Sequence, residues 1–172
     1  MKKEAVMRRT VVMAFAIGIL LLGSQGQALA TDFPKPFEDD VASYTFEENG
    51  DKCTTVSKPP FGGLSAKGCF VKNGDIWRIQ DGSTDGDQTF IYWENWLHDG
   101  STWRPYRHGE CNNNLNAPNW GQCNKDLYEN SSTNYYGGQG SRVRFQVCTR
   151  DIMGNYCIPE DIGGAAWVSN DR

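Results

Sequence analysis

Residues 142–148, with the sequence Arg-Val-Arg-Phe-Gln-Val-Cys, alternate strictly between polar and apolar side chains. In an extended chain this period of two places Val143, Phe145 and Val147 on one face and the arginines on the other. One face suits a protein core and the other suits water. The stretch therefore predicts a strand in a sheet that is covered by the core on one side.

Similar segments lie on both sides of this stretch. Their apolar residues are mostly aromatic or β-branched and come in short runs, separated by many of the 19 glycines of the chain. Asp99-Gly100 lies between two such segments and is the strongest local hairpin signal. Further strands are expected at residues 44–46, 68–71, 76–79, 88–93, 102–104 and 165–168. The sequence predicts an all-β fold with little helix, a disulfide-stabilised antiparallel β-sandwich or small barrel of about seven or eight short strands.

The N-terminus has the features of an export signal. Basic residues precede an apolar run over residues 11–22, and Ala28-Leu29-Ala30 matches the pattern read by signal peptidase. The run is shorter than the roughly 18–20 residues that span a bilayer. Residues 1–30 are therefore predicted to be a cleaved signal peptide, and the mature protein to be secreted, extracellular and free of the membrane.

The mature chain is predicted to have two parts. Residues 31–51 contain two prolines and many acidic side chains, which predicts a flexible acidic lead-in. Residues 52–172 are long enough for a single β domain. Within it, residues 111–140 are rich in Asn, Gly and Tyr without a convincing period, so we expect a long surface loop there, held by a disulfide.

All six cysteines follow the predicted signal peptide. In an oxidising compartment an even number of cysteines predicts three disulfides, for which 15 connectivities are possible. The sequential set is preferred because each of its bonds closes a short loop. This set is Cys53–Cys69, Cys111–Cys123 and Cys148–Cys157.

The charge balance limits the partners. Removal of residues 1–30 leaves 142 residues with 13 basic and 20 acidic side chains, a net charge of −7. Surfaces that bind nucleic acid or anionic membranes need clustered Lys and Arg. We therefore expect neither partner, and we expect a monomer.

Residues 81–87, Asp-Gly-Ser-Thr-Asp-Gly-Asp, match the first half of a calcium-binding loop. Asp81, Asp85 and Asp87 would be the ligands. Position 12 of such a loop, where a bidentate glutamate belongs, is Tyr92. This departure favours the alternative, a hairpin turn in which Asp side chains cap the backbone and glycine adopts positive φ. We expect no cofactor other than this candidate calcium ion.

Aromatic side chains concentrate between residues 92 and 136, with Asn, Asp and Arg between them. Ring faces can stack on sugars or peptides, and planar polar groups can then orient hydroxyls or carbonyls. The alternative, that the rings fill the core, is expected for Trp77, Phe90, Phe145 and Trp167. The predicted ligand-binding residues are Tyr92, Trp93, Trp96, Trp103, Trp120, Tyr135 and Tyr136.

Residues suited to catalysis are few. There are two histidines, His98 and His108, no Gly-x-Ser-x-Gly motif, and no free thiol once the cysteines are paired. A glycan hydrolase needs only two carboxylates, which Glu94 with Asp99 or Glu110 could supply. No motif distinguishes this pair, so the sequence favours a protein without catalytic activity.

Two motifs resemble a protein family. The turn at residues 81–86 ahead of a strand, and the strand 143–148 followed by Cys157 and Trp167-Val168, resemble those of uncharacterised small secreted disulfide-bonded β-proteins of actinobacteria. The resemblance runs from about Trp77 to the end of the chain and is confined to structural residues. It implies an exported β fold and no assigned activity.

Together these features predict a secreted non-catalytic binding module for an extracellular glycan or cell-surface polymer. The alternative is a secreted protein inhibitor or antagonistic toxin, whose rigid loop would act on a partner protein. A carboxylate-based glycan hydrolase is the third hypothesis.

Overall fold

Strands make up most of the structure, a computed structural model that describes residues 32–57 and 64–170. Within these residues the elements are β1 (Glu38–Val41), β2 (Ser43–Thr45), β3 (Lys52–Val56), β4 (Ala66–Val71), β5 (Ile76–Asp81), β6 (Gln88–His98), β7 (Trp103–Asn113), β8 (Trp120–Asn124), β9 (Ser141–Asp151), β10 (Gly154–Ile158), the 3-10 helix η1 (Ile162–Gly164) and β11 (Val168–Ser169). The described residues include no helix long and apolar enough to cross a membrane. The predicted signal peptide lies outside them.

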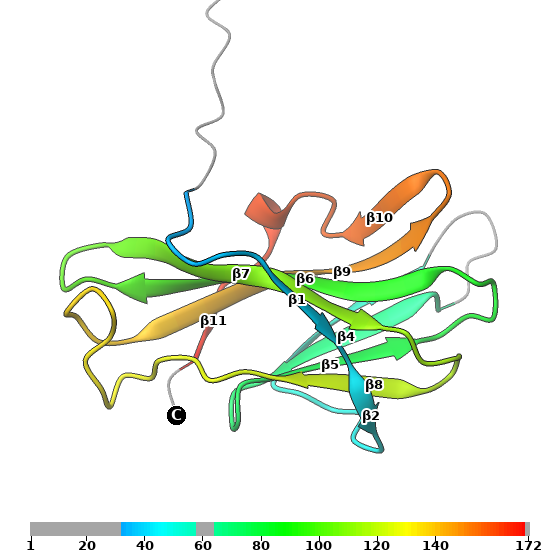
Figure 1. Ribbon diagram of the computed structural model, residues 1–172, viewed down its shortest axis with the longest axis horizontal. Coiled ribbons are helices and arrows are strands. Elements are labelled where there is room, and N and C mark those ends of the chain that lie inside the picture. The colour runs from blue at the N-terminus through cyan, green and yellow to red at the C-terminus, as the bar shows by residue number, and fades with distance from the viewer. Residues whose placement is uncertain (1–31, 58–63, 171–172) are drawn as a thin grey trace, which may run out of the picture. The chain divides into compact units, whose positions relative to one another are not determined.

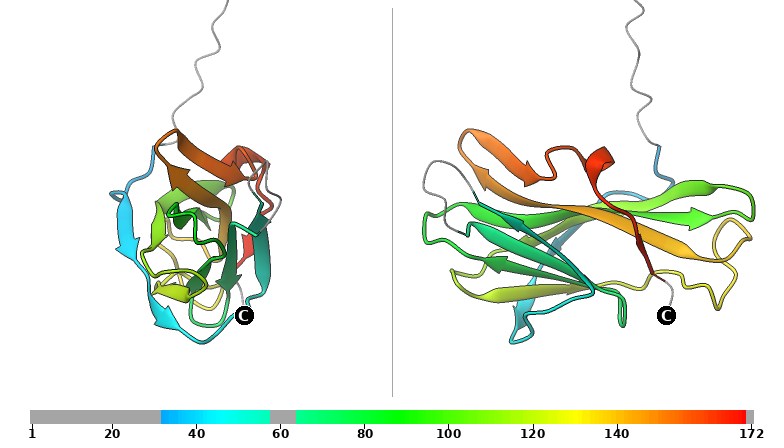
Figure 2. Two further views of the ribbon diagram at one scale, coloured as in Figure 1. Left: turned by 90° about the vertical axis from the view of Figure 1, so that its right-hand side faces the viewer. Right: turned by 180° about the vertical axis from the view of Figure 1, so that it is seen from behind.

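The strands form two sheets that face each other (Figure 1, Figure 2). The first sheet has the order β1-β7-β6-β9-β10, with β11 also paired to β9, and the second has the order β2-β8-β5-β4-β3. Every described pairing is antiparallel except β1 with β7. The predicted all-β sandwich is confirmed, with more and longer strands than expected.

The core lies between the alternating faces of β9, β6 and β5. Val143, Phe145 and Val147 of β9 are buried, as their period of two predicts. The Trp77 ring of β5 lies 5.3 Å from the ring of Phe145 and 6.0 Å from that of Trp93 in β6. Burial of each such side chain stabilises the fold by about 2 kcal/mol. These aromatic contacts hold the two sheets together.

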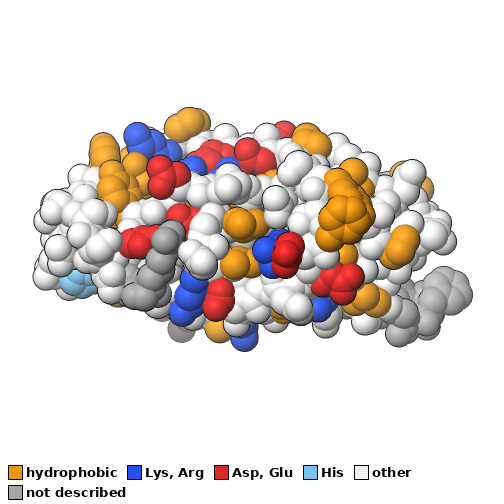
Figure 3. All heavy atoms as spheres, turned by 90° about the horizontal axis from the view of Figure 1, so that it is seen from below, with side chains coloured by type: hydrophobic (Ala, Val, Ile, Leu, Met, Phe, Trp, Pro, Cys, Tyr) orange, Lys and Arg blue, Asp and Glu red, His pale blue; other side chains and the backbone are white. Residues whose placement is uncertain are grey.

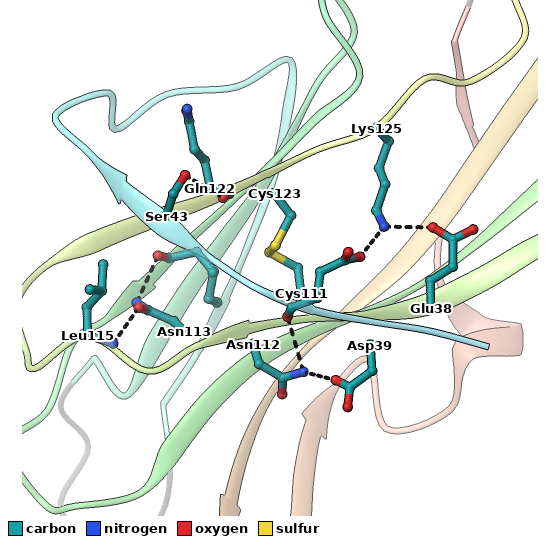
Figure 4. Close-up of a disulfide and its surroundings, with 12 residues drawn as sticks. Glu38, Asp39, Ser43, Cys111, Asn112, Asn113, Leu115, Gln122, Cys123 and Lys125 are labelled. Atoms are coloured by element: carbon teal, nitrogen blue, oxygen red, sulfur yellow. Dashed lines mark hydrogen bonds and ion pairs between the residues drawn. A yellow bond between two sulfur atoms is a disulfide. The ribbon is translucent and has the colours of Figure 1, made fainter.

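The three disulfides have the predicted sequential pairing, Cys53–Cys69, Cys111–Cys123 and Cys148–Cys157. The first and third each join directly opposite residues of neighbouring strands, β3 with β4 and β9 with β10. Cys111–Cys123 joins β7 of the first sheet to β8 of the second. This bond therefore links the two sheets covalently (Figure 4).

The flexible lead-in predicted for residues 31–51 is wrong for residues 38–45, which form β1 and β2. Glu38 accepts a hydrogen bond from Lys125 Nζ at 2.7 Å (Figure 4). It also accepts from Arg107 Nε at 2.6 Å, and Asp40 pairs with Lys125 as well. Asp39 accepts from Asn112 Nδ2 at 2.7 Å. Glu38, Asp39 and Asp40 are adjacent in the sequence and repel one another, but each is paired with a cation or an amide from a distant part of the chain.

The long loop predicted for residues 111–140 is wrong in part, because β8 lies within it. Trp-Gly-Gln-Cys-Asn has little strand character, but β2 pairs with one edge of β8 and β5 with the other. Sheet neighbours therefore impose an extended conformation that the local sequence does not predict. The strand expected at 165–168 is also shorter, since β11 begins at Val168.

The Asp99-Gly100 hairpin between β6 and β7 is confirmed. Gly100 has a φ of 97°, a conformation that favours glycine, and Asp99 Oδ1 accepts hydrogen bonds from the N–H of Ser101 and of Thr102. These bonds, and the Arg104 side chain, lower the pKa of Asp99 to about 2. The hairpin carries the far ends of β6 and β7, where the aromatic residues lie.

Candidate functional site

The predicted ligand-binding aromatics divide into buried rings and two accessible groups. Trp93 is fully buried beside Trp77, and Trp120 is only 6% exposed. Neither ring face is open to a ligand, so the prediction is wrong for these two residues. Alternation along residues 88–93 already placed Trp93 on the same face as Ile91, which is also in the core.

The first accessible group, which we name the tyrosine cluster, consists of one buried ring and three more exposed ones: Tyr106, which is 8% exposed, and Tyr128, Tyr135 and Tyr136. The Tyr106 ring centroid lies 5.7 Å from that of Tyr128 and 5.2 Å from that of Tyr135. Tyr135 and Tyr136 lie 5.1 Å apart with nearly perpendicular rings. The Tyr135 side is open to solvent, since this residue is 54% exposed.

A β-bulge places Tyr106 in this cluster. Asn95 of β6 pairs with Arg107, whereas the next residue, Trp96, pairs with Pro105. Tyr106 is thus an extra residue on β7 without a partner in β6, and a bulge of this kind turns a side chain away from the regular alternation. The other three tyrosines lie on the segment between β8 and β9.

That segment is held to the β6–β7 hairpin by side-chain hydrogen bonds. Asn134 Nδ2 donates to the carbonyl of His98 at 2.8 Å and to that of Gly140 at 3.2 Å. The Tyr136 hydroxyl donates to the carbonyl of Pro105 at 2.7 Å. The cluster therefore has a defined geometry before any ligand binds.

A depression of about 480 Å³ adjoins the cluster. Its lining residues are Tyr106, Arg107, Asp126, Leu127, Tyr128, Glu129, Ser131 and Ser132. Lys35 Nζ lies 5.3 Å from the centroid of the Tyr135 ring. Burial, followed by the neighbouring Tyr128, raises the pKa of Tyr106. The depression thus combines ring faces with hydroxyl, carboxylate and guanidinium groups.

The second accessible group lies on the outer face of the first sheet, and we name it the tryptophan–arginine stack: Trp96, Trp103, Trp167, Arg142 and Arg144. The Arg142 guanidinium carbon lies 4.4 Å from the Trp103 ring centroid and 3.8 Å from that of Trp167. Arg144 lies 4.7 Å from Trp167. Trp167, expected in the core, is instead half-buried over the polar face of β9.

Tyr92 lies on the same outer face but belongs to neither group. Its ring centroid lies 6.5 Å from that of Phe37, in the segment before β1. Burial, followed by the charge of Glu94, raises the pKa of Tyr92 to about 12. The segment before β1 therefore partly covers this predicted ligand contact.

The carboxylates considered for hydrolysis are each engaged by an arginine. Glu94 Oε2 accepts from Arg144 Nε at 2.9 Å, and also from Trp96 Nε1 at 3.0 Å. Glu110 accepts from Arg150 Nη2 at 2.9 and 3.0 Å. Asp99 caps a turn, with its pKa lowered to about 2 rather than raised as a general acid requires. The contacts of Glu94, Glu110 and Asp99 with their arginines are those of structural ion pairs.

The predicted calcium loop has the features of a capped turn. Asp81 Oδ1 accepts from the N–H of Ser83 at 3.1 Å, Asp85 Oδ1 accepts from the N–H of Asp87 at 3.0 Å, and Gly86 has a φ of 84°. The turn crosses between the sheets, from β5 to β6, instead of forming a hairpin. Among the described residues, no three Asp, Glu, His or Cys side chains are placed to hold a metal ion. Calcium binding stays a prediction.

The surface seen from below carries apolar side chains in separate small patches between acidic and basic ones (Figure 3). Large protein interfaces usually need a continuous apolar patch. The described residues of this face do not form one.

Comparison of the chain with protein-family models, curated proteins and solved structures finds no match. The resemblance to secreted actinobacterial β-proteins thus stays a prediction. Any function must be argued from the chemistry of the tyrosine cluster and the tryptophan–arginine stack.

Proposed function

We propose that the protein is a secreted binding module for an extracellular glycan, and that the glycan binds at the tyrosine cluster. The observation that carries the proposal is the depression of about 480 Å³ bordered by tyrosine rings and polar side chains. Sugar sites need ring faces for the apolar faces of pyranoses and planar polar groups for their hydroxyls. The three disulfides support an oxidising, extracellular location.

The contacts in the depression suit a neutral or weakly polar sugar. The half-exposed Tyr135 ring, which contacts the lining residue Tyr106, offers a stacking surface beside the depression. Within the lining, Asp126 and Arg107 offer an acceptor and donors for adjacent hydroxyls. Ser131 and Ser132 add two hydroxyl groups at the rim. Because Asn134 and Tyr136 already hold the loop, binding costs less conformational entropy than it would on a mobile loop.

A glycan array that includes cell-wall polymers, followed by calorimetry on the best ligand, tests the proposal. Tyr135→Ala should weaken binding about tenfold, which corresponds to the loss of one stacking contact of about 1.4 kcal/mol. Tyr44→Ala is the matched control, because Tyr44 is also a tyrosine of similar exposure, 49%, but lies on β2 in the second sheet. This control should bind like the wild type.

Two results would contradict the proposed site. Unchanged glycan affinity in Tyr135→Ala would remove the tyrosine cluster from the interface. Equal losses in Tyr135→Ala and Tyr44→Ala would show that the effect is general and not located at the depression. An array without any bound glycan would contradict the ligand class itself.

One observation favours the second candidate, a secreted protein inhibitor or antagonistic toxin. The β9–β10 hairpin presents Ile152 and Met153 fully to solvent at its tip, and Cys148–Cys157 staples its base. Rigid loops with exposed apolar residues can insert into clefts of partner proteins. Inhibition of a protease in a broad panel, lost in an Ile152→Ser/Met153→Ser variant, would favour this candidate over glycan binding.

A further inference from the structure

Arg142 carries a charge that the described part of the chain does not neutralise. Arg142 and Arg144 project from the same face of β9, and one carboxylate, that of Glu94, lies opposite them. Glu94 pairs with Arg144 at 2.8 Å, whereas no described ion pair or side-chain hydrogen bond involves the Arg142 guanidinium. Counted over the described residues, the outer face of the first sheet thus has one cation in excess at this point.

The position of Arg142 is costly without an anion. Burial, followed by the like charge of Arg144, lowers the pKa of Arg142. Its Nε is buried without a hydrogen-bond partner among the described residues. Stacking on the Trp103 and Trp167 rings offsets part of this cost and fixes the plane of the guanidinium. Unlike Nε, the two Nη groups of Arg142 are not among the buried unpartnered atoms and have no hydrogen bond to the described residues, so this end of the guanidinium can donate to a ligand.

We propose that Arg142 binds the carboxylate of an acidic sugar, a uronate unit of an extracellular polysaccharide. A planar guanidinium donates two parallel N–H bonds to a planar carboxylate, a geometry that a neutral hydroxyl does not reproduce. Arg142 covers one side of the Trp103 and Trp167 rings, and the partly exposed remainder of Trp96, Trp103 and Trp167 supplies apolar surface beside the pyranose. The net charge of −7 on residues 31–172 disfavours dense polyanions such as nucleic acid, so the local charge of Arg142 must supply the attraction for a carboxylate.

This site lies apart from the tyrosine cluster and does not depend on it. The stack consists of residues from β6, β9, the first position of β7 and the residue before β11, whereas the cluster consists of the bulge residue of β7 and the segment after β8. A result that excludes glycan binding at Tyr135 would not contradict uronate binding at Arg142. Conversely, loss of the uronate site leaves binding of neutral glycans at the cluster unchanged.

Calorimetry with trigalacturonate and with its methyl ester is the direct test, because the two ligands differ only in their carboxylate charge. The wild type should bind the acid at least tenfold more tightly than the ester. Arg142→Gln should reduce affinity for the acid at least tenfold and leave the ester unaffected. Lys52→Gln removes the same charge from an exposed position of β3 in the second sheet and should leave both affinities within twofold.

Two further variants separate binding from a structural role. Arg142→Lys keeps the charge without the planar fork, so its affinity for the acid should lie between those of the wild type and Arg142→Gln. Glu94→Gln still offers an acceptor to Trp96 but frees the charge of Arg144, so affinity for the acid should rise severalfold. Thermal melts of each variant report whether the fold is intact.

The proposal is overturned if the wild type binds the acid and the ester equally. This test uses the wild type alone, so it does not depend on whether any variant folds. It is also overturned if folded Arg142→Gln retains the affinity of the wild type for the acid. Galactose 6-sulfate distinguishes the source of the anion. Tighter binding of the sulfate than of galacturonate would replace the uronate by a sulfated sugar.

Discussion

The tyrosine cluster and the tryptophan–arginine stack have similar aromatic compositions but opposite arrangements. In the stack, guanidinium groups fill the space between the rings, with Arg142 3.8 Å from the centroid of Trp167. In the cluster, the rings contact one another and border an open depression. The difference teaches that exposed aromatic residues in a sequence do not identify a binding surface until their neighbours are known. Cations lie over rings in both groups, since Lys35 is 5.3 Å from Tyr135 and Arg104 is 5.9 Å from Tyr136, but the bulge and the pinned loop leave an open depression beside the tyrosine cluster.

The largest expected effect follows from loss of the bond that anchors the cluster. Cys111–Cys123 holds β8, from which the segment with Tyr128, Tyr135 and Tyr136 continues. Cys111→Ala/Cys123→Ala should lower the free energy of unfolding by about 3 kcal/mol through the added entropy of the unfolded chain. Urea denaturation measures this loss.

The same variant tests whether Cys111–Cys123 anchors the tyrosine cluster without anchoring the tryptophan–arginine stack. Hydrogen exchange should accelerate more over residues 125–140 than over β6 and β9, which carry the stack. Cys148→Ala/Cys157→Ala is the control, because that bond joins neighbouring strands of one sheet. Equal acceleration in both regions would contradict the anchoring role of Cys111–Cys123.

Lys125→Met should lower the free energy of unfolding by about 2 kcal/mol. The buried ammonium of Lys125 pairs with Glu38 and Asp40, and its removal leaves these carboxylates facing each other without it. Their partial exposure keeps the loss below that of a fully buried pair. Chemical denaturation at pH 7 measures this loss of stability. Lys125 shares its partner Glu38 with Arg107, which borders the cluster.

The pH dependence of this loss has a defined sign. Burial raises the pKa of Glu38, but the hydrogen bonds and charges of Arg107 and Lys125 outweigh it and lower this pKa below 4.5. The stabilisation is thus present above pH 4.5 and is lost as the pH falls through the pKa of the folded state. The gap between wild type and Lys125→Met should narrow on acidification, and a constant gap from pH 7 to pH 2 would contradict the ion pair.

A pair of alanine variants sharpens the contrast between supporting and open rings. Trp167→Ala removes a half-buried ring stacked on Arg142 and should lower the free energy of unfolding by about 2 kcal/mol. Tyr135→Ala removes a ring that is largely in solvent and should change it by less than about 0.5 kcal/mol. Urea denaturation of both variants gives the two losses in free energy of unfolding. Equal losses would show that the cluster supports the fold as much as the stack does.

The smallest effect concerns the hairpin that both regions share. Asp99 caps the turn and pairs with Arg104 at 2.5 Å, and its pKa is lowered to about 2. Asp99→Asn should destabilise slightly at neutral pH, and in the wild type this contribution should disappear only as the pH falls through about 2. Carboxyl chemical shifts followed from pH 5 to pH 1 test it, and an Asp99 midpoint near 4 would contradict the capping bonds.

Much of the fold could be predicted from local sequence. The alternation over residues 142–148 identified β9, and Asp99-Gly100 identified the hairpin between β6 and β7. The cysteine spacing identified the disulfide pairing. The strand β8 and the strand β1 were missed, because their conformations depend on neighbours more than 60 residues away, such as Arg107 for Glu38. Of the candidate site, Tyr135 and Tyr136 were predicted together, but their partner Tyr106 and the depression beside them were not grouped.

The sequence by itself determined the alternation of core and surface, the turns and the disulfide pairing, because all three depend on contacts between residues close along the chain. Only the tertiary structure decided which aromatic rings reach a ligand. Trp120, expected to contact a ligand, is buried, whereas Trp167, expected in the core, is half-buried outside it against Arg142. The physical reason is that the exposure of a side chain is set by what packs over it, and in this sandwich those covering residues come from distant strands.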